Sequence, residues 1–249
     1  MIRTATITIA LLLAAAPTHG AAPSASAAAI ADTTRPAADR DRDAERKPAE
    51  MLAFAGIKPG MVVVDMLPGG GYFTRLFSTA VGPTGKVIAY VPDEMYANRP
   101  KALDAVTAIS NEPAHKNVVP SHDPALSTGP SGVVDVIWTS QNYHDLHNMP
   151  GLDLVAFNKA RYNMLRPGGV YIVLDHAAPA GSGTADTNTT HRIDPAIVRK
   201  EMEAAGFKFD GESKVLANPA DPRTAKVFDP SVRGHTDQFI LRFRKPGGK

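Results

Sequence analysis

Two short segments of the 249-residue chain concentrate the side chains that can carry chemistry. The first is a run of three glycines, Gly69–Gly71, which follows the β-branched stretch 61–66. The second is the polar stretch Trp138–His147, which reads WTSQNYHDLH. Glycine allows positive φ and close approach of a ligand to the backbone, and histidine exchanges protons near neutral pH. We therefore expect the first segment to bind a ligand and the second to act on one.

The polar stretch follows a predicted strand that ends near Ser140, which places its side chains at the rim of a sheet. His144 or His147 is a candidate general base, because an imidazole titrates near neutral pH. Asp145 lies between the two and is a candidate for orienting one of them. Tyr143 is placed to stack on a substrate. The predicted catalytic residues are therefore Tyr143, His144, Asp145 and His147.

The same histidines allow two other interpretations. Together with Asp175, His176 or His191, the side chains of His144 and His147 offer the nitrogen and oxygen ligands that suit zinc or iron. Their spacing matches no known zinc motif, so the main interpretation assigns no metal ligand. In the third interpretation, these groups cap the end of the strand and form hydrogen bonds within the loop.

A second group of candidate residues follows the flexible segment 181–190, which reads GSGTADTNTT and is typical of a mobile lid. His191 and Arg192 come directly after it and are predicted to bind substrate. A guanidinium group can hold a carboxylate through two parallel hydrogen bonds. The alternative role for Arg192 is a salt bridge to Asp194 or Glu201.

The elements that must position these residues alternate between strand and helix. Short β-branched runs predict strands over 61–66, 86–91, 118–120, 133–139, 170–175, 208–216 and 238–244. Apolar residues at helical spacing predict helices over 40–55, 72–81, 95–109, 152–165 and 195–205. This alternation predicts an α/β domain with a mostly parallel sheet. Ligands of such sheets bind beyond the carboxyl ends of the strands, where the glycine run and the polar stretch both lie.

The glycine run resembles a known motif. A buried strand ends in Asp65, three glycines follow, and an amphipathic helix begins, so that Gly56–Tyr90 resembles the first cofactor motif of the class I S-adenosylmethionine-dependent methyltransferases. LRPGGVYIVLDH, Leu165–His176, resembles the segment that leads into their fifth strand. Over Arg40–Pro246, the chain resembles an exported bacterial group described as predicted methyltransferases.

The resemblance implies a Rossmann-like, three-layer α/β/α fold with a seven-stranded sheet, in which the last strand, 238–244, is antiparallel. It implies S-adenosyl-L-methionine as the cofactor, with its amino-acid part on the glycine loop, which Asp65 organises. Asp123 lies where such enzymes often bind the adenine amino group. The implied cofactor-binding residues are Asp65, Gly69, Gly70, Gly71, Tyr72, Asp123, Gln141 and Asn142.

Two positions depart from the family pattern. Leu67 replaces the usual first glycine of the loop, and Val91 replaces the acid that binds the ribose, with Asp93 and Glu94 just beyond it. The function expected is methyl transfer from S-adenosylmethionine to a small molecule. The alternative is a cofactor-independent or metal-assisted enzyme, or a binding protein, on the same scaffold in the periplasm.

The N-terminus predicts export. Arg3, the apolar run Ala5–Ala16 and the small residues that follow are typical of a signal peptide, assigned to 1–22. An Ala-, Pro- and Ser-rich stretch, 23–39, is predicted to be a flexible linker to the methyltransferase-like domain, 40–249. We expect a periplasmic or secreted protein without a stable membrane span after cleavage. The formal net charge of +2 and the mixed charge pattern give no reason to expect a nucleic-acid partner, and the absence of cysteine excludes disulfides and thiolate chemistry.

Overall fold

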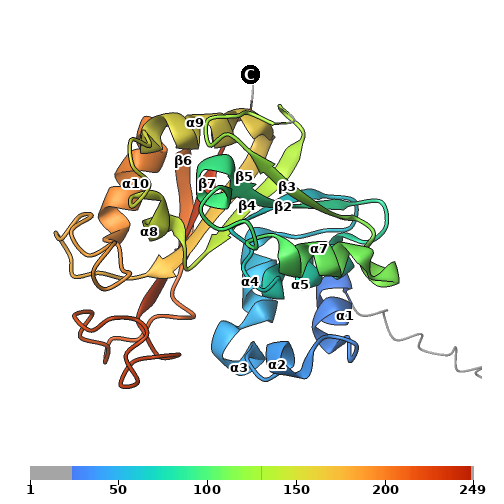
Figure 1. The fold of residues 1–249 in the computed structure, drawn as a ribbon, viewed down its shortest axis with the longest axis horizontal. Coiled ribbons are helices and arrows are strands. Elements are labelled where there is room, and N and C mark those ends of the chain that lie inside the picture. The colour runs from blue at the N-terminus through green and yellow to red at the C-terminus, as the bar shows by residue number, and fades with distance from the viewer. Residues whose placement is uncertain (1–23, 130, 248–249) are drawn as a thin grey trace, which may run out of the picture.

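The computed structural model describes residues 24–129 and 131–247 of the chain (Figure 1). Its centre is a seven-stranded sheet with the order β3-β2-β1-β4-β5-β7-β6. The strands are β1 (Val62–Met66), β2 (Lys86–Pro92), β3 (Val118–Asp123), β4 (Val134–Ser140), β5 (Leu165–His176), β6 (Lys208–Ser213) and β7 (Gln238–Arg244). All seven predicted strands are present, and the predicted α/β fold class is confirmed.

The strand directions also agree with the prediction. Strands β3, β2, β1, β4 and β5 pair in parallel, whereas β7 runs antiparallel to both β5 and β6. The chain moves outward from β1 to β2 and β3, and then returns to place β4 on the other side of β1. This reversal leaves a crevice beyond the carboxyl ends of β1 and β4, where ligands of such sheets bind.

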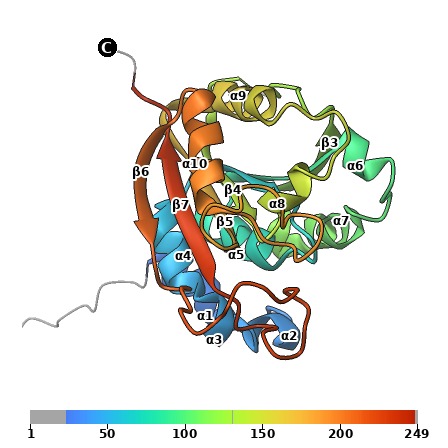
Figure 2. The ribbon, with the colours of Figure 1, turned by 90° about the vertical axis from the view of Figure 1, so that its left-hand side faces the viewer.

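Helices cover both faces of the sheet (Figures 1 and 2). The helices are α1 (Ala25–Ala31), α2 (Ala37–Arg40), α3 (Asp43–Arg46), α4 (Pro48–Ala55), α5 (Tyr72–Val81), α6 (Asp93–Tyr96), α7 (Asp104–Asn111), the 3-10 turn η1 (Pro113–His115), α8 (Tyr143–Leu146), α9 (Leu154–Met164) and α10 (Pro195–Ala204). Apolar residues of α1, α4, α5 and α7 form one core with the sheet, and those of α8, α9 and α10 form the other. No helix in the described ranges is long and apolar enough to cross a bilayer.

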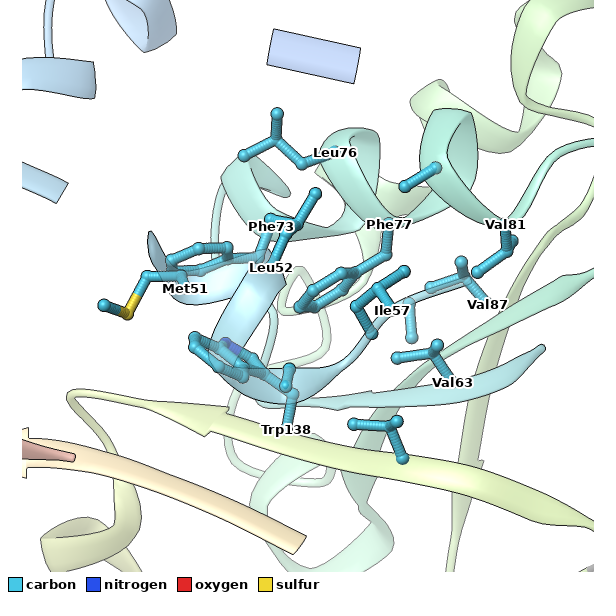
Figure 3. Packing of buried hydrophobic residues seen from close by; sticks show 14 of the residues in the cluster. Met51, Leu52, Ile57, Val63, Phe73, Leu76, Phe77, Val81, Val87 and Trp138 are labelled. Atoms are coloured by element: carbon cyan, nitrogen blue, oxygen red, sulfur yellow. The ribbon is translucent and has the colours of Figure 1, made fainter. Parts of the chain in front are cut away.

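An aromatic cluster fixes the helix that follows the glycine run. Trp138 of β4 is fully buried, with its ring 4.7 Å from that of Phe73 and 5.5 Å from that of Phe77. Leu52 from α4 packs into the same cluster (Figure 3). Buried aromatic pairs of this kind stabilise a core beyond the area that they bury. The cluster therefore holds the start of α5 against the end of β4.

The prediction of a flexible linker over 23–39 is wrong for residues 24–39, the part that the structure describes. It contains α1 and α2, and Ala29 is fully buried in the core that includes α5. Arg35 is also buried, and its guanidinium makes two hydrogen bonds to Asp43, at 2.8 and 2.7 Å. Small alanine side chains let a short helix approach α5 closely, which a composition typical of linkers does not reveal. The predicted signal peptide, 1–22, lies outside the described residues.

Two predicted helices are interrupted. The helix expected over 40–55 is divided among α2, α3 and α4, and α3 is separated from α4 by Lys47, which adopts a left-handed φ of 48° before Pro48. Proline disfavours the α conformation in the residue before it. The helix expected over 95–109 is likewise divided into α6 and α7.

Candidate functional site

The three loop glycines differ in what their backbone positions require. A Cβ atom on Gly71, where φ is +83°, would lie 2.2 Å from Ile109 Cδ1 of α7. Gly71 is therefore needed for the packing of α5 against α7. Gly69, with a φ of +56°, and Gly70 have no atom within 4 Å of an added Cβ. These two glycines border open space, which is the arrangement that a ligand on the loop requires.

Leu67, at the position where the family pattern has a glycine, adopts a left-handed backbone conformation. Its φ is 52°, in the left-handed region that costs a side-chain-bearing residue about 1–2 kcal/mol. The side-chain amide of Asn142 donates to the Leu67 carbonyl at 2.9 Å, and the Thr139 hydroxyl donates to Asn142 Oδ1. Asn142 therefore links the end of β4 to the loop after β1 and stabilises this conformation.

A cavity of about 310 Å³ lies over the glycine loop. This glycine-loop cavity is lined by Asp39, Arg42, Arg46, the segment 65–70, Tyr72, Phe73 and the segment 140–142. Six of the predicted cofactor-binding residues thus come together here, namely Asp65, Gly69, Gly70, Tyr72, Gln141 and Asn142. The cavity occupies the crevice between β1 and β4.

Asp65 is the buried acid of this cavity. Its carboxylate is 3% exposed and accepts a hydrogen bond from the Thr74 hydroxyl at 2.6 Å. Burial raises the pKa of Asp65 to about 7, against the opposing effects of that hydrogen bond and the charge of Arg46. The carboxyl group therefore titrates near neutral pH and is placed to favour a cationic ligand group.

The N-terminal helices form a wall of the cavity that the sequence analysis did not identify. The Arg46 guanidinium lies 4.6 Å from the centre of the Tyr72 ring and donates to Ser140 Oγ at 3.0 Å. The Tyr72 hydroxyl donates to Asp43 Oδ1 at 2.7 Å. Residues 39–47 carry charges of alternating sign, a pattern typical of a solvated helix face, whereas Arg46 is turned inward. The charge pattern does not predict the inward orientation of Arg46, because that orientation depends on the break in the helix at Lys47.

A second cavity adjoins the first. This β2 cavity, of about 400 Å³, is lined by Leu67, Gly69, Val91, Met95, Arg99, Lys101, Ala102, Asn142 and Asp145. It shares Leu67, Gly69 and Asn142 with the glycine-loop cavity. A third, of about 360 Å³, shares Met95, Arg99 and Asp145 with the β2 cavity.

The acids near β2 and β3 do not line the β2 cavity. Asp123 is exposed, and its carboxylate accepts a hydrogen bond from the Ser121 hydroxyl at 3.0 Å. Asp93 pairs with His122 Nδ1 at 2.6 Å, and Glu94 accepts from the Ala125 amide at 3.0 Å. The structure therefore does not bring Asp123 to the site, because β3 is the edge strand and its end faces solvent. Asp93, the possible substitute for the missing acid at Val91, is already paired.

Gln141 separates the glycine-loop cavity from a fourth cavity on the side of the C-terminal loop. That cavity, of about 490 Å³, is lined by Arg42, Glu45, Gln141, His176, Val227, Phe228, Arg233, Gly234, Thr236 and Gln238. Gln141 has a left-handed φ of 61°, and its side-chain amide donates to Gln238 Oε1 at 2.9 Å. A residue predicted to bind cofactor thus also connects β4 to β7.

His144 is the centre of the polar cluster. It is 3% exposed, its backbone N–H donates to Asp175 Oδ2 at 2.8 Å, and its Nδ1 lies 2.8 Å from Asp175 Oδ1. Burial lowers the pKa of His144, but the charge and hydrogen bond of Asp175 and the charge of Asp145 outweigh it, so the pKa is raised overall. Nε2 faces Asp145 Oδ1 at 3.6 Å, and His191 Nδ1 lies 4.0 Å from the same oxygen. His144, Asp145 and His191 are thus brought together, a grouping that only the metal alternative had considered, and Asp175 lies on the other side of the His144 ring.

Asp175 was predicted only as a possible metal ligand, and its role in orienting His144 was missed. The signal was available, because Asp175 lies near the carboxyl end of β5 beside β4, and parallel neighbours end at the same edge.

Two of the predicted catalytic residues point away from the cavities. Tyr143 is fully buried, and its hydroxyl donates to Glu201 Oε2 at 2.9 Å and accepts from the Asn158 amide at 2.7 Å. His147 Nε2 lies 3.3 Å from Glu201 Oε2 of α10. The predictions for Tyr143 and His147 are therefore wrong in this structure, because one turn of α8 places both on the face that packs against α9 and α10. His176, a possible metal ligand, is instead bonded to the Thr236 hydroxyl at 2.7 Å, and burial lowers its pKa to about 4.

Arg192 does not face a substrate site. It is fully buried, with two hydrogen bonds to Asp221 at 2.8 and 3.2 Å and others to the carbonyls of Ala177 and Ala225. The prediction that Arg192 binds substrate is therefore wrong, because its guanidinium is already committed to the C-terminal loop. The alternative partners, Asp194 and Glu201, were also incorrect.

Loss of Asp221 is expected to destabilise the protein strongly. Asp221→Ala leaves the buried Arg192 guanidinium without its counterion, which typically costs about 3–5 kcal/mol of unfolding free energy. It also removes the acceptor for the Asp237 amide, which is 2.6 Å away. Urea unfolding followed by circular dichroism measures the change, with the exposed Asp229→Ala as the control. Equal midpoints for the two variants would contradict a structural role for the pair.

Comparison with known proteins gives the context of this site. No protein-family model matches the chain. Among curated proteins, it is similar to the ubiquinone/menaquinone biosynthesis C-methyltransferase of Saccharophagus degradans, with 27% identity over 195 residues. The alignment covers 77% of this chain and 67% of that enzyme, so the chain spans about two thirds of the relative's length.

Solved structures share the fold at lower identity. A SAM-dependent methyltransferase from Aquifex aeolicus has a TM-score of 0.59 and 18% identity, with 84% of this chain and 95% of that one covered. The [4+2]-cyclase SpnF has a TM-score of 0.61 and 17% identity, with 82% of each chain covered. The common features are the mixed sheet and its covering helices.

Proposed function

Because the chain belongs to the superfamily of class I S-adenosylmethionine-dependent methyltransferases, we propose that it methylates a small-molecule acceptor. The observation that carries the proposal is the glycine-loop cavity, which lies at the crevice between β1 and β4 and continues into the β2 cavity. S-adenosylmethionine would supply an electrophilic methyl group on its sulfonium. The contribution of the protein is to hold the cofactor and the acceptor in line and to exclude water.

The residues of the two cavities fit this cofactor. Gly69 and Gly70 leave space beside the backbone, and Asp65 offers a carboxylate to the cationic amino group of the amino-acid part. Val91 and Met95 give the β2 cavity an apolar wall suited to an adenine ring. The ribose would lack the usual acid at Val91, so we assign no residue to its hydroxyls.

The acceptor is proposed to bind on the side of Asp145 and His191. Asp145 lines both the β2 cavity and the third cavity beside it, and His191 is a third exposed. The volumes of these two cavities, about 400 and 360 Å³, lie within the usual range of small-molecule sites, about 300–1,000 Å³. His144, held by Asp175, is the group proposed to activate the acceptor.

Calorimetric titration with S-adenosylhomocysteine tests the cofactor assignment directly. We expect one binding site per chain and release of S-adenosylhomocysteine from S-adenosylmethionine once an acceptor is supplied from a small-molecule panel. At about 1 mM S-adenosylhomocysteine, a binding free energy of only about 4 kcal/mol is still detected. If no heat of binding is observed at that concentration, the proposal is rejected. It would favour another reaction, or binding alone, on the same scaffold.

We further propose that the protein is exported to the periplasm or secreted, on the basis of Arg3 and the apolar run Ala5–Ala16. The Ser24 side chain caps α1, and Ala29 is buried against the core, which favours a cut before Ser24. Mass spectrometry of the protein from its native host is therefore expected to show a start after Gly20 or Ala22. Protein that retains Met1 in the cytoplasmic fraction would contradict export.

A further inference from the structure

We propose that His144, Asp145 and His191 form a binding site for one divalent transition-metal ion of the zinc type. This metal site goes beyond the proposed methyl transfer. It rests on the proposed function only for the identity of the molecule that would bind next to the ion. One ligand atom from each of the three side chains lies within 4.8 Å of the other two. Two imidazoles and one carboxylate are a ligand set that zinc and related ions prefer.

The distances are close to those of a coordinated ion. Tetrahedral bonds of about 2.0–2.1 Å place neighbouring ligand atoms about 3.4 Å apart. Asp145 Oδ1 lies 3.6 Å from His144 Nε2 and 4.0 Å from His191 Nδ1. Both separations are too long for direct hydrogen bonds, yet small side-chain movements would let the three atoms converge on one ion. His191 has the freedom for this movement, because a third of its side chain is exposed.

Asp175 orients the buried ligand. Its carboxylate lies 2.8 Å from His144 Nδ1, which leaves Nε2 directed at Asp145 and His191. Metal-binding histidines nearly always donate their other ring N–H to a carboxylate or carbonyl in this way. Asp175 is itself fully buried and also accepts the backbone N–H of His144. The orientation of His144 is therefore fixed before any ion arrives.

The backbone at His191 also serves this arrangement. Its φ is 58°, a conformation that side-chain-bearing residues seldom adopt, and its ring centre lies 5.4 Å from that of His144. The segment before it is connected to the turn after α8, because the Thr187 hydroxyl donates to Asn148 Oδ1 at 3.0 Å. The loop 181–194 is thus held where His191 faces Asp145.

Three protein ligands leave at least one coordination position for another molecule, as in catalytic zinc sites. Asp145 lines the β2 cavity and the third cavity, so that position is accessible from the proposed acceptor side. The ion would select acceptors that offer an oxygen donor, such as a hydroxyl or carbonyl group, and would draw electron density from that oxygen.

Cobalt binding tests the site without requiring turnover. The full mature chain is treated with a chelator, dialysed and titrated with Co²⁺ alone, followed by visible absorption and calorimetry. We expect one equivalent to bind with the d–d bands of a nitrogen- and oxygen-ligated ion, and Zn²⁺ to displace it. His191→Asn, which keeps a residue that tolerates positive φ, is expected to weaken binding by more than about 100-fold, since loss of an outer partner alone costs 10–100-fold.

The matched control is His122→Gln, which removes a histidine that also pairs with an aspartate, Asp93, but has no third ligand beside it. This variant is expected to bind Co²⁺ like the wild type. No Co²⁺ or Zn²⁺ binding to wild type, or equal binding to His191→Asn, would overturn the proposal and leave an ordinary ion-pair cluster. Titration of the chelator-treated protein with S-adenosylhomocysteine keeps the outcomes separate, because it reports on the cofactor assignment whether or not an ion binds.

Discussion

Gly70→Val is expected to abolish binding of S-adenosylhomocysteine while the protein remains folded. Gly70 has no left-handed φ and no atom within 4 Å of an added Cβ, so the backbone accepts a side chain at this position without strain. The open space that it fills is the glycine-loop cavity, where the two methyl groups would displace a ligand from the backbone. We expect affinity to fall by at least about 100-fold, which corresponds to about 2.7 kcal/mol.

Calorimetry with S-adenosylhomocysteine measures this loss, and thermal unfolding shows that the variant is folded. Gly247→Val is the matched control, because Gly247 also lacks a left-handed φ and has open surroundings, but lies in the C-terminal tail. Wild-type affinity in Gly70→Val would show that the cofactor does not contact this loop. Gly71→Val is unsuitable for the test, since its Cβ would clash with Ile109 and disturb α5.

His144→Asn is expected to lower turnover by about 100- to 10,000-fold, the usual effect of removing a group that moves a proton or activates a substrate. The asparagine amide nitrogen takes nearly the position of His144 Nδ1, so the hydrogen bond to buried Asp175 is retained. What is lost is Nε2, the atom that faces Asp145. The affinity for S-adenosylhomocysteine is expected to stay nearly unchanged, because His144 does not line the glycine-loop or β2 cavity.

The measurement is the rate of S-adenosylhomocysteine release with a saturating acceptor, beside a binding titration of the same variant. His147→Gln provides the control, since His147 faces Glu201 on the side of α10 and touches neither cavity. Similar rates for His144→Asn and wild type would leave His144 as a structural cap of the loop after β4. Equal losses in both histidine variants would indicate a general disturbance of α8.

The sequence was sufficient to predict the strands of the sheet, but not the helices that precede them in the chain. Runs such as MVVVDM and VYIVLD are apolar on both faces, and only a sheet covered on both sides buries them, so their identity as parallel strands followed. The N-terminal helices have no such constraint. Their shape depends on the break at Lys47 and on the ion pair between buried Arg35 and half-buried Asp43, which are tertiary features.

The site was predicted in part for a similar reason. Residues at the ends of β1 and β4 were found because sheet topology brings those ends together, and this applies to Asp65, Gly69, Gly70 and Asn142. The direction of each side chain after β4 depended on a single helical turn, α8, whose phase the sequence does not determine. Tyr143 and His147 consequently face α10, whereas Asp145 lines two of the cavities and His144 faces Asp145.

The buried acid of the glycine loop couples ligand binding to the protons of the solution. With a pKa of about 7, the Asp65 carboxyl is close to half-protonated at neutral pH. A cationic ligand group stabilises the ionised form and lowers that pKa, so binding must release protons from the protein. The affinity for such a ligand therefore rises with pH through this range and levels off once Asp65 is ionised. The heat observed on binding will accordingly depend on the ionisation enthalpy of the buffer. The charge of the cofactor, as well as its shape, therefore contributes to its affinity for this cleft.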